Sequence, residues 1–362
     1  MTRLAIAGGA LLLGCLATLA AGDAPSTSTA TAPPPGADKP TDDEAIDPKA
    51  KAAVDKGCAY LAAVQKDDGS FPADLGDTSA VVGLAVLAWL GAGSLPGEGP
   101  YGREVARSVE YLLRCQQPDG LIHRDGTGSP PLYGHGYATL ALAEIWGESQ
   151  DPRIGAALKK AVLRLATSQS KAGGWRYDPD GKEDDVSSTV IQLMALRAAA
   201  DAGCFVPADT MRRAAAYIAA HHNAKSKGGD GGFAYGHGKD PASAYPRSAA
   251  GLTALLVAGE FAAPAVRETL VFLLQYQPFG RKGAYQFIYY GHYYAAFGIH
   301  QTQSLGEWGT RAWRAWYPAV VKELTANQGA SGAWIGMQGV STTALALLTL
   351  QVPLRYLPVY QR

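Results

Sequence analysis

Apolar residues recur at helical spacing along most of this chain, and two kinds of helical stretch alternate. Stretches of the first kind carry Lys, Arg and Glu on one face, which is typical of amphipathic helices at a protein surface. Stretches of the second kind are rich in Ala and Leu and nearly uncharged, as expected of helices covered on all sides. The first set covers residues 50–64, 101–115, 151–168, 207–221, 264–276 and 310–326, and the second covers residues 78–90, 136–146, 186–200, 248–261, 293–301 and 341–350.

A loop motif, Gln-x-x-x-Gly-x-aromatic, joins the two helices of each pair. Its copies follow one another at about 50 to 58 residues, a period typical of helical repeat proteins. We expect the motif to indicate architecture rather than chemistry, with Gln serving free carbonyls at a helix end and Gly allowing a tight reversal. Complete copies are Gln65–Phe71, Gln169–Trp175 and Gln328–Trp334, residues 116–122 end in Ile122, and degenerate copies contain Gly231-Gly232-Phe233 and Gly283-Ala284-Tyr285.

A single helix pair cannot bury its apolar face, so neighbouring pairs must stack. Closure into a ring is favoured over an open array, because a ring hides the uncharged helices from water. The sequence therefore predicts an all-α fold, an α6/α6 toroid (barrel) of about six helix-pair repeats.

Composition agrees with a large folded domain. Of the 362 residues, 47% are hydrophobic and 18% are charged, which supports a sizeable core. The formal net charge is zero and no basic stripe is present, so a nucleic-acid partner is not expected.

The N-terminal region has a different composition. Residues 1–22 contain Arg3 and an apolar run, and they predict an export signal that ends in small residues. Two alternatives are a lipoprotein signal with Cys15 as the lipidated residue and an uncleaved anchor that tethers the protein to a membrane. Residues 23–47 predict a disordered Pro/Ser/Thr linker, and residues 48–362 the toroid domain. The expected location is periplasmic, cell-surface or secreted.

Three cysteines remain beyond Cys15, namely Cys58, Cys115 and Cys204. Their odd number and irregular spacing predict no disulfide framework, although one bridge or three buried thiols are both compatible with the sequence.

The loop motif resembles the QW motif of triterpene cyclases and the related repeat of protein prenyltransferase β subunits, over roughly residues 48 to 355. This resemblance implies a barrel with a central cavity lined by inner-helix ends, and an isoprenoid or other apolar small molecule as a partner. The zinc site of the prenyltransferases requires Asp-x-Cys, which does not occur here, so neither a metal nor a cofactor is expected.

The acid motif of squalene–hopene cyclases, Asp-x-Asp-Asp-Thr, is partly matched at residues 182–186. Asp184 and Asp185 fit, while Lys182 stands where the first Asp belongs. The resemblance implies that Asp184 or Asp185 is a general acid that protonates an alkene. An Asp directly before a helix is also a common N-cap, and this reading stays open.

The tripeptide Tyr-Gly-His occurs three times, at residues 133–135, 235–237 and 290–292. His135 and His292 precede the expected inner helices at the place that Asp77 and Asp185 hold in other repeats. We expect His135, Asp185 and His292 to meet at one mouth of the ring, as an acid/base or binding site. Packing of Tyr and His in Gly-rich loops is the alternative.

Two functions remain open on these grounds. The protein is either an exported binding or scaffold module with an apolar central cavity, or a divergent terpene cyclase/mutase-type enzyme with Asp184/Asp185 as acid. A deep aromatic-lined pocket around a desolvated carboxyl group would favour the enzyme, and a filled centre would favour the scaffold. The oligomeric state is left open.

Overall fold

The computed structural model describes residues 46–72, 78–124, 130–149, 151–236, 240–275, 287–336, 339–354 and 357. The described residues all belong to one compact unit. The expected signal at residues 1–22, Cys15 and nearly all of the expected linker lie outside the described residues. Helix α1 begins at Pro48 and is capped by Asp47, whose Oδ1 accepts a hydrogen bond from the Lys49 N–H at 2.7 Å.

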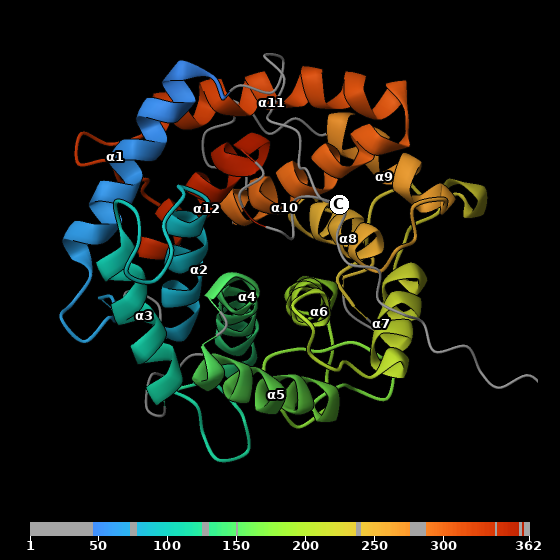
Figure 1. Ribbon diagram of the computed structural model, residues 1–362. Helices are drawn as coiled ribbons and strands as arrows, with labels where there is room; N and C mark the ends of the chain where they lie inside the picture. The colour runs from blue at the N-terminus through green and yellow to red at the C-terminus, as the bar shows by residue number, and fades with distance from the viewer. Residues whose placement is uncertain are drawn as a thin grey trace, which may run out of the picture. The chain divides into compact units, whose positions relative to one another are not determined.

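The helices form two concentric layers (Figure 1). Each inner helix packs against the inner helices of the preceding and following pairs, and α12 packs against α2. The inner layer is therefore a closed ring, and the predicted α/α toroid is confirmed. The inner helices are α2 (Thr78–Leu90), α4 (Pro131–Ser149), α6 (Val186–Asp201), α8 (Tyr245–Val257), α10 (Ile288–Gln301) and α12 (Val340–Gln351). The outer helices are α1 (Pro48–Val64), α3 (Gly102–Arg114), α5 (Pro152–Thr167), α7 (Ala208–Ala220), α9 (Pro264–Gln275) and α11 (Glu307–Asn327). Three short 3-10 helices, η2 (Lys225–Lys227), η3 (Thr302–Leu305) and η4 (Val352–Leu354), complete the helical elements of the described ranges.

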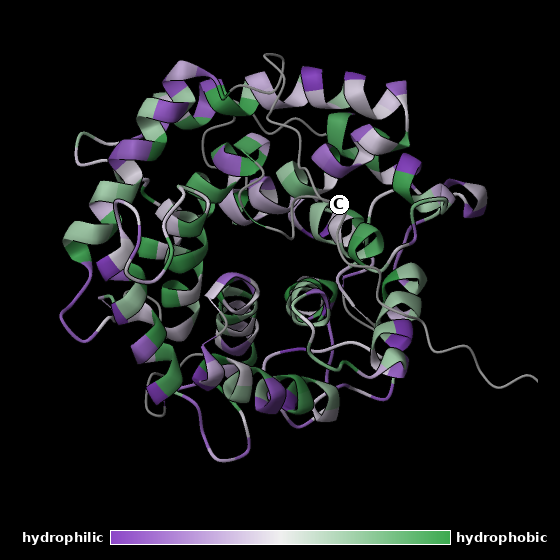
Figure 2. Ribbon diagram, in the orientation of Figure 1, coloured by the Kyte–Doolittle hydropathy of each residue, from purple (hydrophilic) through white to green (hydrophobic). Residues whose placement is uncertain are grey.

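Hydropathy follows the two layers (Figure 2). The outer helices alternate polar and apolar residues and place their apolar side on the ring, whereas the inner helices are buried around most of their circumference. In α6, for example, the run from Ser188 to Leu196 is buried at every position. This is the distribution that the two kinds of stretch predicted.

The glutamine of the loop motif connects successive repeats. In each complete copy its side-chain amide donates to the carbonyl of the glycine four residues later and to a carbonyl of the next outer helix. Gln169 Nε2, for example, lies 2.8 Å from Gly173 O and 2.9 Å from Thr210 O. The corresponding carbonyls of the next outer helix are those of Glu104 for Gln65, Ala157 for Gln116 and Ala53 for Gln328.

The last of these bonds closes the ring. Gln328 Nε2 donates to Ala53 O at 2.8 Å, although the two residues are 275 positions apart in the chain. Gly332 has φ +91°, and a Cβ there would lie 2.4 Å from Lys56 O, so only glycine allows the loop to approach α1 this closely. One layer further in, Gln351 Nε2 on α12 donates to Ala88 O on α2 at 2.8 Å.

Helices α4 and α10 begin five residues earlier than the hydropathy pattern predicts. The tripeptides at 133–135 and 290–292 therefore lie inside helices, not in loops before them. Gly291 shows one reason, since a Cβ at this position would lie 2.9 Å from the ring of Tyr245. The glycine lets α10 approach α8. From the sequence alone, a glycine at this position suggests a loop, because the packing that requires it is not visible there.

Cys58, Cys115 and Cys204 are buried free thiols, so the alternative of a disulfide among them is wrong. Burial raises the pKa of Cys58 to about 12, and the charge of Asp55 adds to this effect. Among the described helices, none combines the length and the apolar character needed to cross a membrane.

The closing hydrogen bonds of Gln328 generate a prediction. Gln328→Ala removes two partly buried hydrogen bonds, one of them across the seam, and we expect it to lower the free energy of unfolding by about 2 kcal/mol. Urea denaturation followed by circular dichroism measures the change, with Gln303→Ala in the short helix η3 as the matched control. A Gln328→Ala midpoint equal to that of the control would contradict the role of this seam.

Candidate functional site

Asp185 is the residue around which a candidate site is built. It is the N-cap of α6, and its Oδ1 accepts a hydrogen bond from the Ser188 N–H at 2.6 Å. The Asp185 N–H donates to Trp175 O at 3.0 Å, which ties the cap to the loop motif of the same repeat. The side chain is fully buried, at 0% exposure, so a carboxyl group lies in the interior of the molecule.

The second carboxyl oxygen of Asp185 faces polar groups from two loops. The Tyr235 hydroxyl donates to Oδ2 at 3.1 Å, and Arg176 Nε lies 3.5 Å from the same oxygen. Tyr235 is bonded in turn to the Tyr177 hydroxyl at 3.0 Å, and the Arg176 guanidinium lies over the Tyr177 ring at 4.6 Å. Arg176 also pairs with Glu183. A helix N-terminus, a guanidinium and a hydroxyl thus all stabilise negative charge on this carboxyl group.

Tyrosines from opposite sides of the ring complete this region. The Tyr290 hydroxyl on α10 donates to Ser187 O at the start of α6, at 2.7 Å. The hydroxyls of Tyr137 on α4 and Tyr294 on α10 are hydrogen-bonded at 3.0 Å. We define the tyrosine cluster as Tyr133, Tyr137, Tyr177, Tyr235, Tyr290 and Tyr294.

The hydroxyls of Tyr290 and Tyr294 stay protonated. Burial raises the pKa of Tyr290 well above its ordinary value, and the negative charges of Tyr137 and Asp185 would raise it further. Burial likewise raises the pKa of Tyr294. The cluster therefore surrounds Asp185 with aromatic faces and hydroxyl groups. The ring interior thus has one feature expected of the enzyme, a desolvated carboxyl group, and one expected of the scaffold, a filled centre. A desolvated carboxyl is present, and aromatic side chains occupy the space beside it.

The side chains of Asp184 and Asp185 contact different neighbours at the start of α6. Asp184 accepts a hydrogen bond from Ser170 Oγ at 2.8 Å and lies beside Tyr217 of the outer helix α7, whose pKa is raised mainly by burial and secondly by the charge of Asp184. Only Asp185 therefore faces the tyrosine cluster.

His135 does not reach this region, contrary to expectation. It lies within α4, where its Nδ1 accepts from the Ile122 N–H at 3.0 Å and its Nε2 lies 3.2 Å from Ala161 O on the outer helix α5. In other repeats a hydroxyl makes the bond to the motif N–H, as Thr189 does for Trp175 and Thr343 for Trp334. His135 thus replaces a Thr of the repeat, and its ring lies between the inner and outer layers.

His292 is also directed away from Asp185. Its Nδ1 is hydrogen-bonded to the Tyr245 hydroxyl at 2.9 Å, and its Nε2 lies 3.7 Å from Glu323 Oε2 on the outer helix α11. The Trp316 ring packs edge-on against it at 5.9 Å. The expectation that His135, Asp185 and His292 meet at one mouth is therefore wrong, because both histidines lie inside helices on the side that faces the outer layer. Asp77 and His237 lie outside the described residues.

In the Tyr-Gly-His tripeptides, the tyrosines rather than the histidines lie around Asp185. Tyr235 bonds directly to Asp185, and the charge of Asp185 raises the pKa of both Tyr133 and Tyr290, although burial is the largest cause. The first residues of the three tripeptides converge where the histidines were expected. Tyr137, Tyr177 and Arg176 carry no such signal in the sequence, since only the fold brings them to the ring interior.

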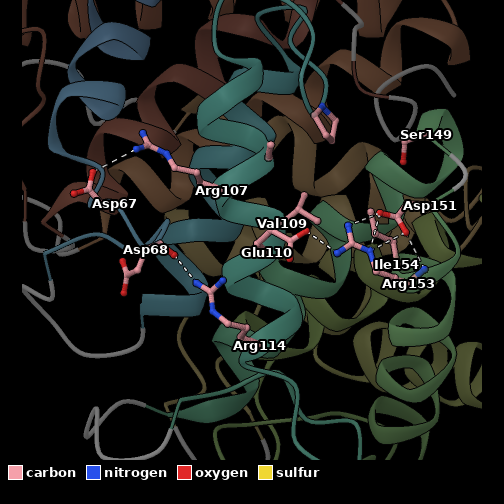
Figure 3. A pocket seen from close by; sticks show the side chains of 12 residues that line it. Asp67, Asp68, Arg107, Val109, Glu110, Arg114, Ser149, Asp151, Arg153 and Ile154 are labelled. Atoms are coloured by element: carbon pink, nitrogen blue, oxygen red, sulfur yellow. Dashed lines mark hydrogen bonds and ion pairs between the residues drawn. The ribbon is translucent and has the colours of Figure 1, made fainter.

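A separate groove of about 550 Å³ lies outside the ring, along α3 (Figure 3). Its charged side chains are largely paired with one another, as in Arg153 with Glu110 at 2.7 Å and with Asp151 at 2.8 Å. Arg114 donates to the backbone carbonyl of Asp68 at 2.7 Å. The groove therefore offers no group directed at a ligand as clearly as Asp185. Across the described residues, no three His, Cys, Asp or Glu side chains gather as metal ligands do.

Sequence comparison finds two curated relatives. A drimenyl diphosphate synthase from Streptomyces showdoensis is 29% identical over 169 residues, which is 46% of this chain and 30% of that protein. A drimenyl diphosphate synthase from Streptantibioticus cattleyicolor is 27% identical over 141 residues, or 38% of this chain and 25% of that protein. The matched part thus spans less than a third of either relative. No protein-family model matches the chain.

Structural comparison finds the same fold in two groups of enzymes. A type II terpene cyclase from Scytonema, in complex with the product merosterolic acid A, matches with a TM-score of 0.57 and 16% identity over 84% of this chain and 97% of that one. The chain is thus similar to terpenoid cyclases in part of its sequence and in its fold. An α-1,6-mannanase from a Salegentibacter species matches with a TM-score of 0.63 and 8% identity over 85% of this chain and 99% of that one. The relationship to terpenoid cyclases rests on sequence and fold together, whereas the mannanase shares the toroid alone.

His135 generates a prediction about pH. Burial lowers its pKa from 6.5 to about 4. Between pH 6.5 and pH 4, His135 is therefore protonated in the unfolded chain but neutral in the folded protein. We expect the stabilising effect to be complete above about pH 6.5 and to be lost as the pH falls toward 4, by roughly 3 kcal/mol. Urea unfolding at pH 7 and pH 4.5 measures this loss, and His135→Thr should remove most of the difference. An equal pH dependence in the variant would show that other groups cause it.

Proposed function

We propose that this protein is a terpene cyclase-type enzyme that holds an isoprenoid chain in the interior of the ring and uses Asp185 as the general acid. The observation that carries the proposal is the fully buried Asp185 carboxyl group beside the tyrosine cluster. The relatives named drimenyl diphosphate synthase and the cyclase structures support an apolar, isoprenoid-type ligand.

Protonation of an alkene requires a strong acid, because an alkene is a very weak base. Asp185 would transfer its carboxyl proton to an alkene carbon, which leaves a carbocation on the substrate and a carboxylate on the protein. The Ser188 N–H, the Tyr235 hydroxyl and Arg176 lie where they stabilise that carboxylate, and this stabilisation strengthens the acid. The aromatic faces of the cluster would stabilise the carbocation by cation–π interaction, while their protonated hydroxyls do not compete for the proton.

The roles of the other predicted site residues follow from their positions. Asp184 would position the loop before α6 through Ser170, and His135 and His292 would support the helices between the two layers. These three residues would affect stability before they affect chemistry.

A second candidate function is a binding module that holds an isoprenoid without converting it. Two observations favour it, namely Lys182 in the place of the first Asp of the acid motif and Arg176 only 3.5 Å from the Asp185 carboxyl group. A carboxylate that is paired with a cation and caps a helix has a structural role that requires no proton transfer.

The two candidates are separated by Asp185→Asn. Asn retains the capping of α6 but has no acidic proton, so we expect at least a hundredfold loss of cyclic product with an intact fold. The assay incubates purified protein with farnesyl diphosphate and with squalene, and detects cyclic products by gas chromatography and mass spectrometry. Asp184→Asn is the matched control and should retain most of the activity.

The outcomes are distinct. Undiminished product formation by Asp185→Asn overturns the acid role of this residue. Binding of both isoprenoids by the wild type without any cyclic product favours the binding module instead.

We also propose that the protein is exported, from the apolar run that follows Arg3. We expect the mass of the native purified protein to correspond to loss of about 22 N-terminal residues. Retention of Cys15 with an added lipid mass would support a membrane tether in its place, and an unprocessed N-terminus in a soluble fraction would contradict export.

A further inference from the structure

One face of α10 runs along the interior of the ring. Tyr290, Tyr294, Phe297 and Gln301 follow one another at helical spacing and are all buried. Tyr290 lies at the end near Asp185, as its hydrogen bond to Ser187 O shows. At 1.5 Å per residue, this face extends for about 16 Å from Tyr290 to Gln301.

Tyr137 and Tyr294 meet across the ring partway along this face. In the order α2, α4, α6, α8, α10, α12, the helices α4 and α10 occupy opposite positions, so their side chains meet only through the centre (Figure 1). The two hydroxyls are 3.0 Å apart, and the side chains are exposed by only 4% and 0%. The backbone at Tyr294 is held in turn by Thr253 Oγ1 of α8, which donates to Tyr294 O at 2.8 Å. The pair therefore bridges the ring interior between α4 and α10, and we call it the partition.

Beyond this partition lies an apolar pocket of about 330 Å³. It is formed by the C-terminal ends of α6, α8 and α10, whereas Asp185 lies at the N-terminal end of α6. Phe297, one turn after Tyr294, is part of its wall. The lining residues are Arg197, Leu256, Val257, Gly259, Phe261, Phe297 and Gln301.

We propose that the Tyr137–Tyr294 pair sets the maximum length of the isoprenoid chain that the ring interior accepts. The inference rests on the proposed function, since it takes the isoprenoid to enter beside Asp185. A chain that extends toward the C-terminal ends of the inner helices meets the paired tyrosines, and the apolar space behind them stays out of reach.

The physical reason is the combined cost of displacing the pair. Passage of a longer chain has to break a buried hydrogen bond and move two aromatic side chains that are packed on all sides. Removal of one of the two tyrosine side chains would instead connect the region beside Asp185 to the apolar pocket along Phe297. The additional carbons of a longer chain would then be buried against Leu256, Val257 and Phe297.

The experiment measures binding of geraniol, farnesol and geranylgeraniol by titration calorimetry to the wild type, Tyr294→Ala and Tyr294→Phe. We expect Tyr294→Ala to bind geranylgeraniol at least tenfold more tightly than the wild type does, with geraniol affinity changed less than threefold. Tyr294→Phe loses the hydrogen bond but retains the aromatic ring, so its shift toward geranylgeraniol should be smaller than that of Tyr294→Ala. Tyr317→Ala is the matched control, because Tyr317 is an equally large buried side chain on the outer helix α11.

Each result decides a different point. A shift toward geranylgeraniol in Tyr294→Ala but not in Tyr317→Ala supports the partition. Unchanged relative affinities in a folded Tyr294→Ala protein overturn it while leaving the proposed function intact. If Tyr294→Ala does not fold, Tyr137→Ala is measured in its place, with the same shift expected. Absence of binding of all three alcohols by the wild type overturns both the partition and the isoprenoid-binding function on which it rests.

Discussion

The side-chain amide of the loop-motif glutamine is the interaction on which the rest of this structure depends. Each amide satisfies a carbonyl of its own loop and a carbonyl of the next outer helix, so a local turn and a contact between repeats are made by the same group. The last copy reaches back to α1 and makes the array a ring. An open array would leave inner helices such as α2 and α12 with an uncovered apolar side, and closure removes that exposure.

The closed ring also creates the environment of Asp185. An N-cap aspartate at a protein surface is an ordinary helix signal, stabilised by water as much as by the helix. The toroid places this N-cap in the interior and surrounds it with tyrosines from α4, α10 and two loops. The same carboxyl group is thereby desolvated beside aromatic faces, and the proposed acid role rests on this environment.

The site was only partly predictable from the sequence. Asp185 was predicted from a partial match to the acid motif of squalene–hopene cyclases, and this required no knowledge of the ring. The histidines of the Tyr-Gly-His tripeptides were predicted to join Asp185, because they precede the expected inner helices at the place that Asp185 holds in its own repeat. His135 and His292 lie in helices that begin earlier than hydropathy indicated, and they face the outer layer. The tyrosines of the same tripeptides, which bear weaker chemical signals, are the residues that converge on Asp185.

The helical class, the number of repeats and the alternation of outer and inner helices could all be predicted without the structure. These follow from hydropathy period and from a motif with a fixed local geometry, both of which act over a few turns of chain. The tertiary structure alone decided which side chains share the ring interior. Tyr137 and Tyr294 are 157 residues apart, and no local pattern relates them. Their contact exists because ring closure places α4 opposite α10, and that placement is a property of all the repeats together.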